Sequence, residues 1–204
     1  MKEFRQKHRG RGLQRTALAI TGVIATLCLG VMGGLARAGD VYAEEAVKAA
    51  FLLRFTSYVT WPGKSTDTPF RIAVLGDKTM TARLRALVEN RSVGGRPIEV
   101  NQIATVAEAR DVHLLYIGNW RSPDLSALLA PLRARPILVV TDTADGLEAG
   151  STINFLIADQ RVRFEVSMEA ARRAGLVISS ELLSAAVRVQ GGRMLNLLSR
   201  GQGL

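Results

Sequence analysis

The sequence predicts an α/β fold: a single-domain mixed sheet, largely parallel with a C-terminal antiparallel hairpin, flanked by helices on both faces. Two observations lead to this prediction. Four short apolar runs alternate with segments of helical spacing, which is typical of βα repeats around a parallel sheet. They are followed by the stretch STINFLIADQRVRFEV at residues 151–166, in which apolar residues alternate on both sides of a polar pair, as in a hairpin.

The chain begins with a basic stretch at residues 1–15, an apolar stretch at 16–35 and the triplet Ala-Arg-Ala at 36–38. A charged region, an apolar region and a small-x-small site are the three parts of a secretory signal peptide. We therefore predict a signal peptide over residues 1–38, with cleavage after its last residue, and an exported domain over residues 39–204. The apolar stretch is also long enough to span a membrane, so an uncleaved anchor is the alternative.

Removal of this leader changes the charge balance. It holds seven of the 27 basic and one of the 18 acidic residues, so 20 basic and 17 acidic side chains remain, a net charge of +3. We therefore expect no nucleic-acid partner. The only cysteine, Cys28, lies in the leader, which excludes disulfides and thiol chemistry from the domain. The remaining chain is long enough to form one core by packing alone.

The first predicted helix runs from Val41 to Tyr58, where apolar residues recur at helical spacing and acidic residues come early. It stops before Trp61-Pro62, because a proline disfavours helical angles in the preceding residue. Trp61 either packs over the helix end or anchors a partner. The next apolar runs predict strands at residues 70–75, 98–103, 112–117 and 136–141, and helical spacing predicts helices at 79–88 and 123–132.

The hairpin has a register that can be tested against its apolar pattern. If Asp159 and Gln160 form the loop, three apolar pairs fall on one face: Ile157 with Val162, Phe155 with Phe164, and Ile153 with Val166. A three-residue loop would expose half of these side chains, so a loop of two or four residues is favoured. Asp-Gln is a poor pair for a primed turn, which leaves the turn type open.

The C-terminal part of the chain is predicted to add two closing helices. They cover residues 168–174 and 180–189 and are separated by Gly175, and the pair Gly191-Gly192 ends the second.

Acidic residues follow two of the predicted strands, where open sheets bind ligands. Asp77 follows the first strand, and Asp142 and Asp145 follow the fourth. The glycines needed for a dinucleotide fingerprint or a phosphate-binding loop are missing. Asp142 and Asp145 are compatible with a metal site, but a turn-forming role is favoured. We expect no cofactor and no metal.

His113 is the only histidine beyond the leader, and it lies inside an apolar run. The chain has no G-x-S-x-G nucleophile motif, and one histidine without cysteines does not make a structural zinc site. We expect His113 to be packed and hydrogen-bonded. The lack of a catalytic constellation favours a binding or regulatory protein that is not an enzyme.

The second face of the hairpin is predicted to be polar. Arg161, Arg163 and Glu165 project from it, with Asn154 and Leu156 on the neighbouring strand. Since Leu156 is apolar, this face is either partly covered by a helix or a contact surface.

Several segments together resemble the YfiR-like periplasmic proteins: AVKAAFLLRFTSYVTWP, FRIAVLGD, GRPIEV, DVHLLYIG, ILVVTD and GSTINFLIADQRVRFEVSMEAARRAGLVISSELLSAAVRV. The resemblance runs from about Val47 to Val189. Its specificity lies in the combination of Phe55…Trp61-Pro62, Ile153-Asn154-Phe155…Arg163-Phe164-Glu165 and Leu182-Leu183.

This resemblance implies a non-enzymatic regulator in the periplasm. Such a protein represses an inner-membrane diguanylate cyclase, or a related sensor, through protein contacts, and an outer-membrane lipoprotein relieves the repression by sequestering it. The result is control of cyclic di-GMP and biofilm formation. The resemblance also implies an α/β fold that is often dimeric, so a homodimer is a further expectation. Our candidates for partner contact are Trp61, Leu156, Arg163 and Glu165.

The chain departs from the family pattern at two places. Ala73 and Val112 stand where members commonly carry cysteines, so redox control through a disulfide is not expected. Ala149-Gly150 replaces the usual glycine pair before the hairpin. A periplasmic small-ligand sensor using the loops at Asp77 and Asp142 is the alternative function, and a hydrolase is the least supported.

Overall fold

The computed structural model describes residues 44–64, 66–118 and 124–191, which all belong to one compact unit beginning at Glu44. The predicted signal peptide at residues 1–38, residues 41–43 of the first predicted helix and residue 123 of the helix predicted at 123–132 lie outside this part. Within it, every helix is too short or too polar to cross a membrane.

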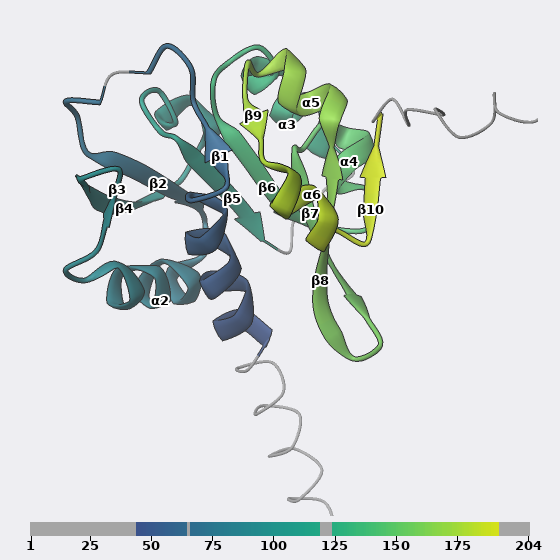
Figure 1. Ribbon diagram of the computed structural model, residues 1–204, viewed down its shortest axis with the longest axis horizontal. Coiled ribbons are helices and arrows are strands. Elements are labelled where there is room, and N and C mark those ends of the chain that lie inside the picture. Colours follow the sequence, from purple (N-terminus) through teal and green to yellow (C-terminus); the bar gives the residue numbers. More distant parts are fainter. Residues whose placement is uncertain (1–43, 65, 119–123, 192–204) are drawn as a thin grey trace, which may run out of the picture. The chain divides into compact units, whose positions relative to one another are not determined.

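An eight-stranded sheet forms the centre of the domain (Figure 1). In spatial order its strands are β10 (Arg188–Gln190), β8 (Arg161–Ser167), β7 (Ile153–Ala158), β6 (Leu138–Asp142), β5 (Leu114–Gly118), β2 (Phe70–Leu75), β4 (Arg96–Ile103) and β3 (Ser92–Val93). The five strands from β7 to β4 run parallel, and β8 is antiparallel to β7. At the two edges, β10 runs parallel to β8 and β3 antiparallel to β4. The predicted mixed, largely parallel sheet is confirmed.

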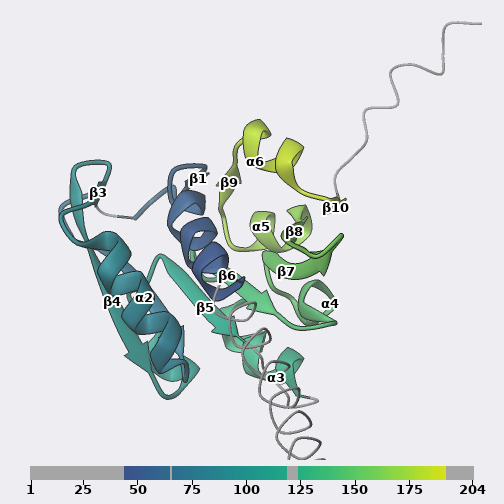
Figure 2. The same cartoon turned by 90° about the horizontal axis from the view of Figure 1, so that it is seen from below.

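Helices cover both faces of this sheet (Figure 2). A hydrophobic core lies on each face of the sheet. Because successive residues of a strand point to opposite faces, β2 contributes to both cores: Ile72 and Val74 pack in the first, and Ala73 and Leu75 in the second. The first core is covered by the helix over residues 44–55, α2 (Lys78–Val88) and α6 (Ser180–Ala185), and the second by η1 (Val106–Glu108), α3 (Leu125–Leu129), η2 (Ala130–Leu132) and α4 (Gly146–Ala149).

Three helices begin at a side-chain cap that accepts a hydrogen bond from a backbone N–H, as short polar residues do at helix starts. The capping residues are Asp77 for α2, Ser167 for α5 (Met168–Arg173) and Ser179 for α6. Between α5 and α6, β9 (Val177–Ile178) pairs antiparallel with β1 (Val59–Thr60), a two-stranded sheet that the sequence did not indicate.

The β7–β8 hairpin has the predicted register, with all three apolar pairs in place. Asp159 and Gln160 form a two-residue loop, and their φ angles of 50° and 58° are the positive values that a type I′ turn requires at both positions. The prediction of a fully buried apolar face is wrong at Ile157, whose side chain is 52% exposed. The reason is that the hairpin projects beyond the body of the domain, so no core lies beneath its outer end (Figure 1).

The chain after Ala185 also differs from the prediction. A helix was expected to continue to residue 189, but α6 ends at Ala185 and β10 follows. The Val187 N–H donates to the Phe164 carbonyl (3.0 Å), and Arg188 then pairs with Glu165 in the ladder to β8. Tertiary pairing with β8 therefore overrides the helical spacing. The first helix likewise ends at Phe55, three residues before the predicted end, in a turn.

Candidate functional site

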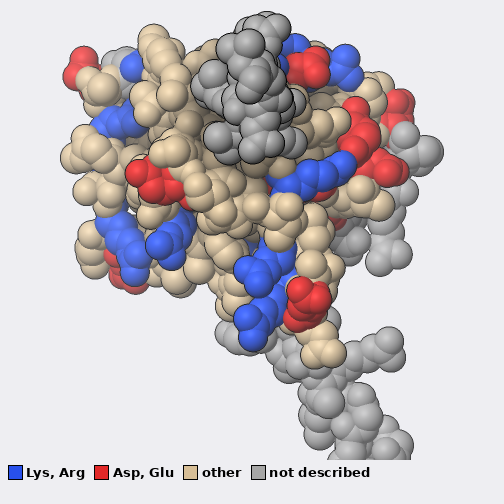
Figure 3. All heavy atoms as spheres, turned by 45° about the vertical axis from the view of Figure 1, so that its right-hand side comes forward, with Lys and Arg blue, Asp and Glu red and all other residues tan. Residues whose placement is uncertain are grey.

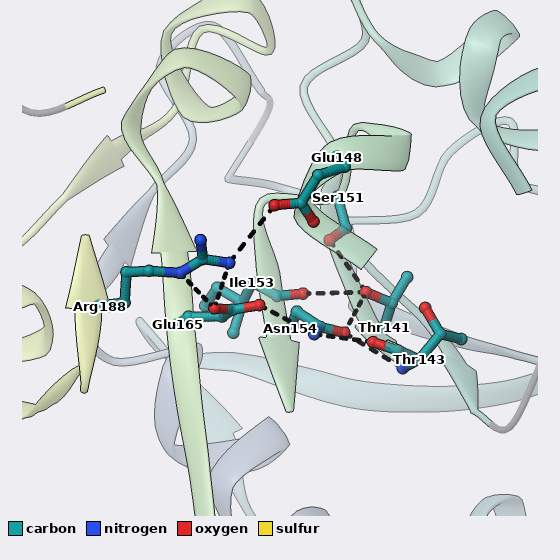
Figure 4. Close-up of polar contacts among 8 residues, drawn as sticks. All are labelled: Thr141, Thr143, Glu148, Ser151, Ile153, Asn154, Glu165 and Arg188. Carbon is teal, nitrogen blue, oxygen red and sulfur yellow. Dashed lines mark hydrogen bonds and ion pairs between the residues drawn. The ribbon is translucent and has the colours of Figure 1, made fainter. Parts of the chain in front are cut away.

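Polar side chains gather where β6, β7, β8 and β10 lie side by side, on the hairpin face predicted to be polar (Figure 4). Strand register explains why they meet: Thr141 on β6 lies beside Asn154 on β7, and Asn154 lies opposite Glu165 on β8. Glu165 in turn lies beside Arg188 on β10. We call this set the polar cluster, comprising Thr141, Thr143, Glu148, Ser151, Asn154, Glu165 and Arg188.

Asn154 is the centre of the polar cluster and is buried. Its Oδ1 lies 2.8 Å from Thr141 Oγ1 and accepts from the Thr143 N–H at 3.2 Å. Its Nδ2 donates to the Thr143 carbonyl at 2.9 Å and to Glu165 Oε1 at 3.1 Å. All four hydrogen-bonding positions of the amide are therefore used, which fixes its orientation.

Glu165 is a buried carboxylate, with 5% of the residue exposed. Its Oε2 accepts from Arg188 Nε and Nη2, both at 2.7 Å. This hydrogen bond raises the pKa of Arg188, whose half-exposed guanidinium also reaches Glu148 Oε1 at 3.4 Å. A buried charge needs such pairing, so β10 supplies the compensation for Glu165.

Gly146 lies against the polar cluster at the start of α4. A Cβ at this position would stand 2.2 Å from Thr141 Oγ1 and 2.3 Å from Asn154 Oδ1, so only glycine allows the close approach. Thr141 Oγ1 also lies 2.9 Å from Ser151 Oγ.

An open recess of about 380 Å³ borders the polar cluster at the carboxyl ends of the strands. Its walls comprise Asp142, Thr143, Ala144, Asn154, Phe155, Leu156, Glu165 and Arg188. Asp142 is ion-paired with Lys48 of the first helix, which also pairs with Glu44. Burial lowers the pKa of Lys48, but its hydrogen bonds to Asp142 and Glu44 outweigh that effect, and its pKa lies above the ordinary value.

Of the other strand-end acids, Asp77 has a local structural role, because its Oδ1 accepts from the Met80 N–H at 2.8 Å. Asp145 precedes α4, but its side chain makes no capping hydrogen bond to that helix. The described part of the chain has no group of three His, Cys, Asp or Glu side chains placed to hold a metal ion.

The four partner candidates lie in two places. Leu156 and Arg163 face each other across the hairpin, partly exposed, next to the buried Glu165. Trp61 is distant from them in the fold and 8% exposed: its Nε1 donates to the His113 carbonyl at 2.8 Å, and its ring packs edge-on against Phe70. Contact by any of the four stays a prediction.

His113 is packed and hydrogen-bonded, as expected. Its Nδ1 accepts from the Arg71 N–H at 3.1 Å, and its ring stacks on Phe70 with centroids 4.5 Å apart. Burial lowers the pKa of His113 to about 4, and the positive charges of Lys64, Arg96 and Arg71 act in the same direction.

An apolar groove of about 310 Å³ lies on the opposite face of the hairpin, between the first helix, β8 and α6. Phe51 and Phe55 of the helix pack edge-on against Phe164, with centroids 5.6 and 5.1 Å apart. The sequence pattern assigned these rings to the core and gave no sign that α6 leaves a gap beside them. The groove is lined by Phe51, Arg54, Phe55, Tyr58, Phe164, Glu181, Leu182 and Ala185.

Comparison with protein families gives one match to this domain. The family described as YfiR/HmsC-like matches residues 45–187, more than half of the chain. The chain belongs to the YfiR/HmsC-like family. The match includes the first helix, the parallel strands, the hairpin and α6, and so confirms the resemblance seen in the sequence.

The two other comparisons add little to the YfiR/HmsC-like assignment. Curated proteins give no match. Among solved structures, the chain is similar to one described as the ABC domain in complex with L-Trp from Streptococcus pneumonia, with a TM-score of 0.43 and 12% identity. That alignment covers 61% of this chain and 57% of that chain, and we draw no conclusion from it.

Ala73 and Val112, the two positions at which the resemblance led us to look for cysteines, lie in the second core of this YfiR/HmsC-like chain, at 0% and 5% exposure. The sequence has no cysteine beyond residue 28, so no disulfide links parts of the domain.

Proposed function

We propose that this YfiR/HmsC-like protein is a non-enzymatic periplasmic regulator that represses an inner-membrane diguanylate cyclase through protein contacts. Repression lowers cyclic di-GMP and with it biofilm formation. Family membership supports a regulatory role, and the predicted leader supports export. The mechanism is a population shift, in which the bound regulator favours the inactive conformation of the cyclase. An outer-membrane lipoprotein that sequesters the regulator relieves repression, and the active form is a homodimer.

The observation that supports this proposal is an apolar surface that the described part of the domain leaves open. It consists of the groove described above together with Ile157 and Val162 on the same face of the hairpin. Val162 and Phe164 are two residues apart on β8 and share this face, so hairpin and groove form one surface. A contiguous apolar patch that stays exposed, rimmed by polar residues, is typical of a binding surface.

The rim of the groove provides specificity to this surface. Arg54 and Glu181 line it with opposite charges, around a floor of aromatic rings. A groove of this size accommodates an apolar anchor side chain of a partner, and the charged rim selects its flanking residues.

On the opposite hairpin face, Leu156 and Arg163 are accessible, and we propose them as direct partner contacts. Basic and acidic side chains lie together where the domain projects at the lower end of the view in Figure 3. Glu165 is buried, and its proposed role is to support this hairpin face from inside. Trp61 lies away from the hairpin and is 8% exposed, and we propose it as a separate contact.

The proposal is tested by measuring cyclic di-GMP and matrix production in the host cell. Deletion of the protein is expected to raise both, and Ile157→Asp or Ala185→Asp is expected to act like deletion. Val177→Asp is the matched control, because Val177 is 57% exposed on β9, away from the hairpin. Thermal unfolding establishes that the variants fold. Unchanged cyclic di-GMP after deletion would contradict the proposal.

A second candidate function, a periplasmic small-ligand sensor, is favoured by the open recess beside the polar cluster. Arg188 and Asp142 stand on its wall with opposite charges, which suits a small zwitterion. A thermal-shift screen with amino acids and nucleotides tests it. A saturable shift that Asp142→Ala abolishes supports a sensor, and the lack of any shift counts against it.

A further inference from the structure

A row of basic side chains lies at the amino ends of the parallel strands. This is the end of the sheet opposite to the hairpin tip. Arg71 is the second residue of β2, Arg96 the first of β4, and Arg135 lies three residues before β6. Lys64 follows β1. We call these four residues the basic edge.

Contacts bring the basic edge to one segment, residues 110–113, which leads into β5. Lys64 Nζ donates to the Val112 carbonyl at 2.6 Å, and Arg135 donates to the Arg110 carbonyl. Arg71 donates its backbone N–H to His113 at 3.1 Å. Two of these cationic groups therefore bond to neutral carbonyl oxygens, which leave their positive charge in place.

The charges of the basic edge act on one another. Burial lowers the pKa of Lys64, and Arg135, Arg71 and Arg96 add to this effect although Asp111 opposes it. Glu99 pairs with Arg71 at 3.1 Å, and both side chains are partly exposed. His113, with a pKa of about 4, carries no charge at neutral pH and so does not change the net charge of the basic edge.

The width of the basic edge indicates what it fits. The backbones of β4 and β6 are three strand spacings apart, or roughly 14 Å, and cations reach inward from both sides. Arg96 Nη1 lies 3.2 Å from His113 Nε2, and Arg135 donates to the Arg110 carbonyl. The cations come from four separate segments, so the positive charge is spread along the ends of several strands, which suits anionic groups side by side.

We propose that the basic edge is a contact surface for the anionic phospholipid headgroups of a membrane. Phosphate groups of neighbouring lipids lie along the row, and each accessible Lys or Arg adds to the attraction. This contact does not depend on the cyclase proposal. It orients the domain so that the hairpin points away from the lipid, free for a protein partner (Figure 1).

The test is flotation of the full chain with phosphatidylcholine vesicles, with and without phosphatidylglycerol. We expect stronger binding to the anionic vesicles, reduced roughly thirtyfold by Arg71→Gln combined with Arg135→Gln, since each basic group contributes about a fivefold factor. Lysine at both positions keeps the charge and is expected to retain binding. Lys78→Gln with Arg161→Gln is the matched control: it removes two exposed charges from the carboxyl-end side and is expected to bind like the native chain.

Equal binding by the glutamine variant and its control would overturn the proposal, as would equal binding to both vesicle types. Hydrogen exchange on the native chain gives an independent readout. Amides at residues 110–113 are expected to gain protection with anionic vesicles and not with inorganic phosphate alone. Protection by inorganic phosphate alone would assign a small-anion site instead, and protection by neither would refute the contact.

Discussion

Lys48 and Asp142 form an ion pair across 94 residues of sequence, and this pair ties the first helix to the carboxyl end of β6. Lys48 is 5% exposed, whereas the side chains of Asp142 and Glu44 keep 25% and 35% exposure. The lysine is thus inside, and its two carboxylate partners stand at the surface. The first helix lines the apolar groove, so the same pair fixes one wall of that groove.

Replacing Lys48 by methionine is expected to lower the free energy of unfolding by about 1–3 kcal/mol, because two partly buried carboxylates lose their counter-ion. Urea unfolding measures this. A double-mutant cycle with Asp142→Asn isolates the pair, and Asp145→Asn, at an exposed neighbouring acid, is the control. A coupling energy of zero would show that Lys48 and Asp142 do not stabilise each other.

Glu165 and Glu148 both contact Arg188 but differ in burial, which makes them a matched pair. Glu165→Ala is expected to cost about 2 kcal/mol of unfolding free energy, since it removes a partner from the buried Asn154 amide and releases β10. Glu148→Ala, at a half-exposed side chain, is expected to change stability by less than about 0.5 kcal/mol. Equal losses from the two substitutions would contradict the structural role assigned to Glu165.

Asp77 caps α2, and its removal is expected to destabilise the domain by about 1 kcal/mol. Asp77→Ser retains a capping oxygen and is expected to recover most of the loss, as monitored by thermal unfolding. Asp145→Ala is the control, because the Asp145 side chain makes no capping hydrogen bond to α4. A loss of similar size at both aspartates would argue against the cap as its cause.

His113 is expected to make stability depend on pH. Its pKa is about 4 in the folded chain against 6.5 for an ordinary histidine, so the unfolded chain binds a proton between these values that the folded chain does not. Stability from this group is therefore full above about pH 6.5, falls as the pH drops toward 4, and changes no further below that. The full loss is about 3 kcal/mol.

Urea unfolding near pH 7 and near pH 4.5 checks this expectation. Carboxylates titrate in the same range, so His113→Gln is the control. The glutamine variant is expected to lose less stability between the two conditions than the native chain, by about 2 kcal/mol. An identical pH dependence of both chains would show that the pKa of His113 is not lowered in the folded chain.

The sequence predicted correctly the parts of this fold that depend on the alternation of apolar and polar residues along a strand. The hairpin register followed from the apolar pairs alone, since a slip by one residue would turn Phe155 and Phe164 into water. Burial of His113 followed from its apolar neighbours. The strand at Arg188 was missed because Leu182 and the residues after it keep helical spacing, although Val187 and Val189 are β-branched and alternate as in a strand.

The candidate sites were harder to predict because they depend on three-dimensional packing. Leu156 and Arg163 lie on the hairpin face that the alternation of apolar and polar residues predicted. Glu165, however, is buried beneath Arg188, which comes 23 residues later in the chain. Asp142 follows its strand as expected, yet its partner Lys48 comes from the first helix. Exposure of Ile157 depends on how far the hairpin extends past the helices, which no local pattern encodes.

The position of β10 has a consequence for the order of folding. Glu165 lies on β8, but Arg188 comes 23 residues later in the chain, beyond α5, β9 and α6, and pairs with this carboxylate only once β10 is in place. Until then β8 is an open sheet edge, which is where unfinished β proteins pair with one another. β10 is short and bears an arginine, so its arrival both neutralises the buried carboxylate and ends the sheet. The domain is thus protected from this kind of self-association only once β10 has docked.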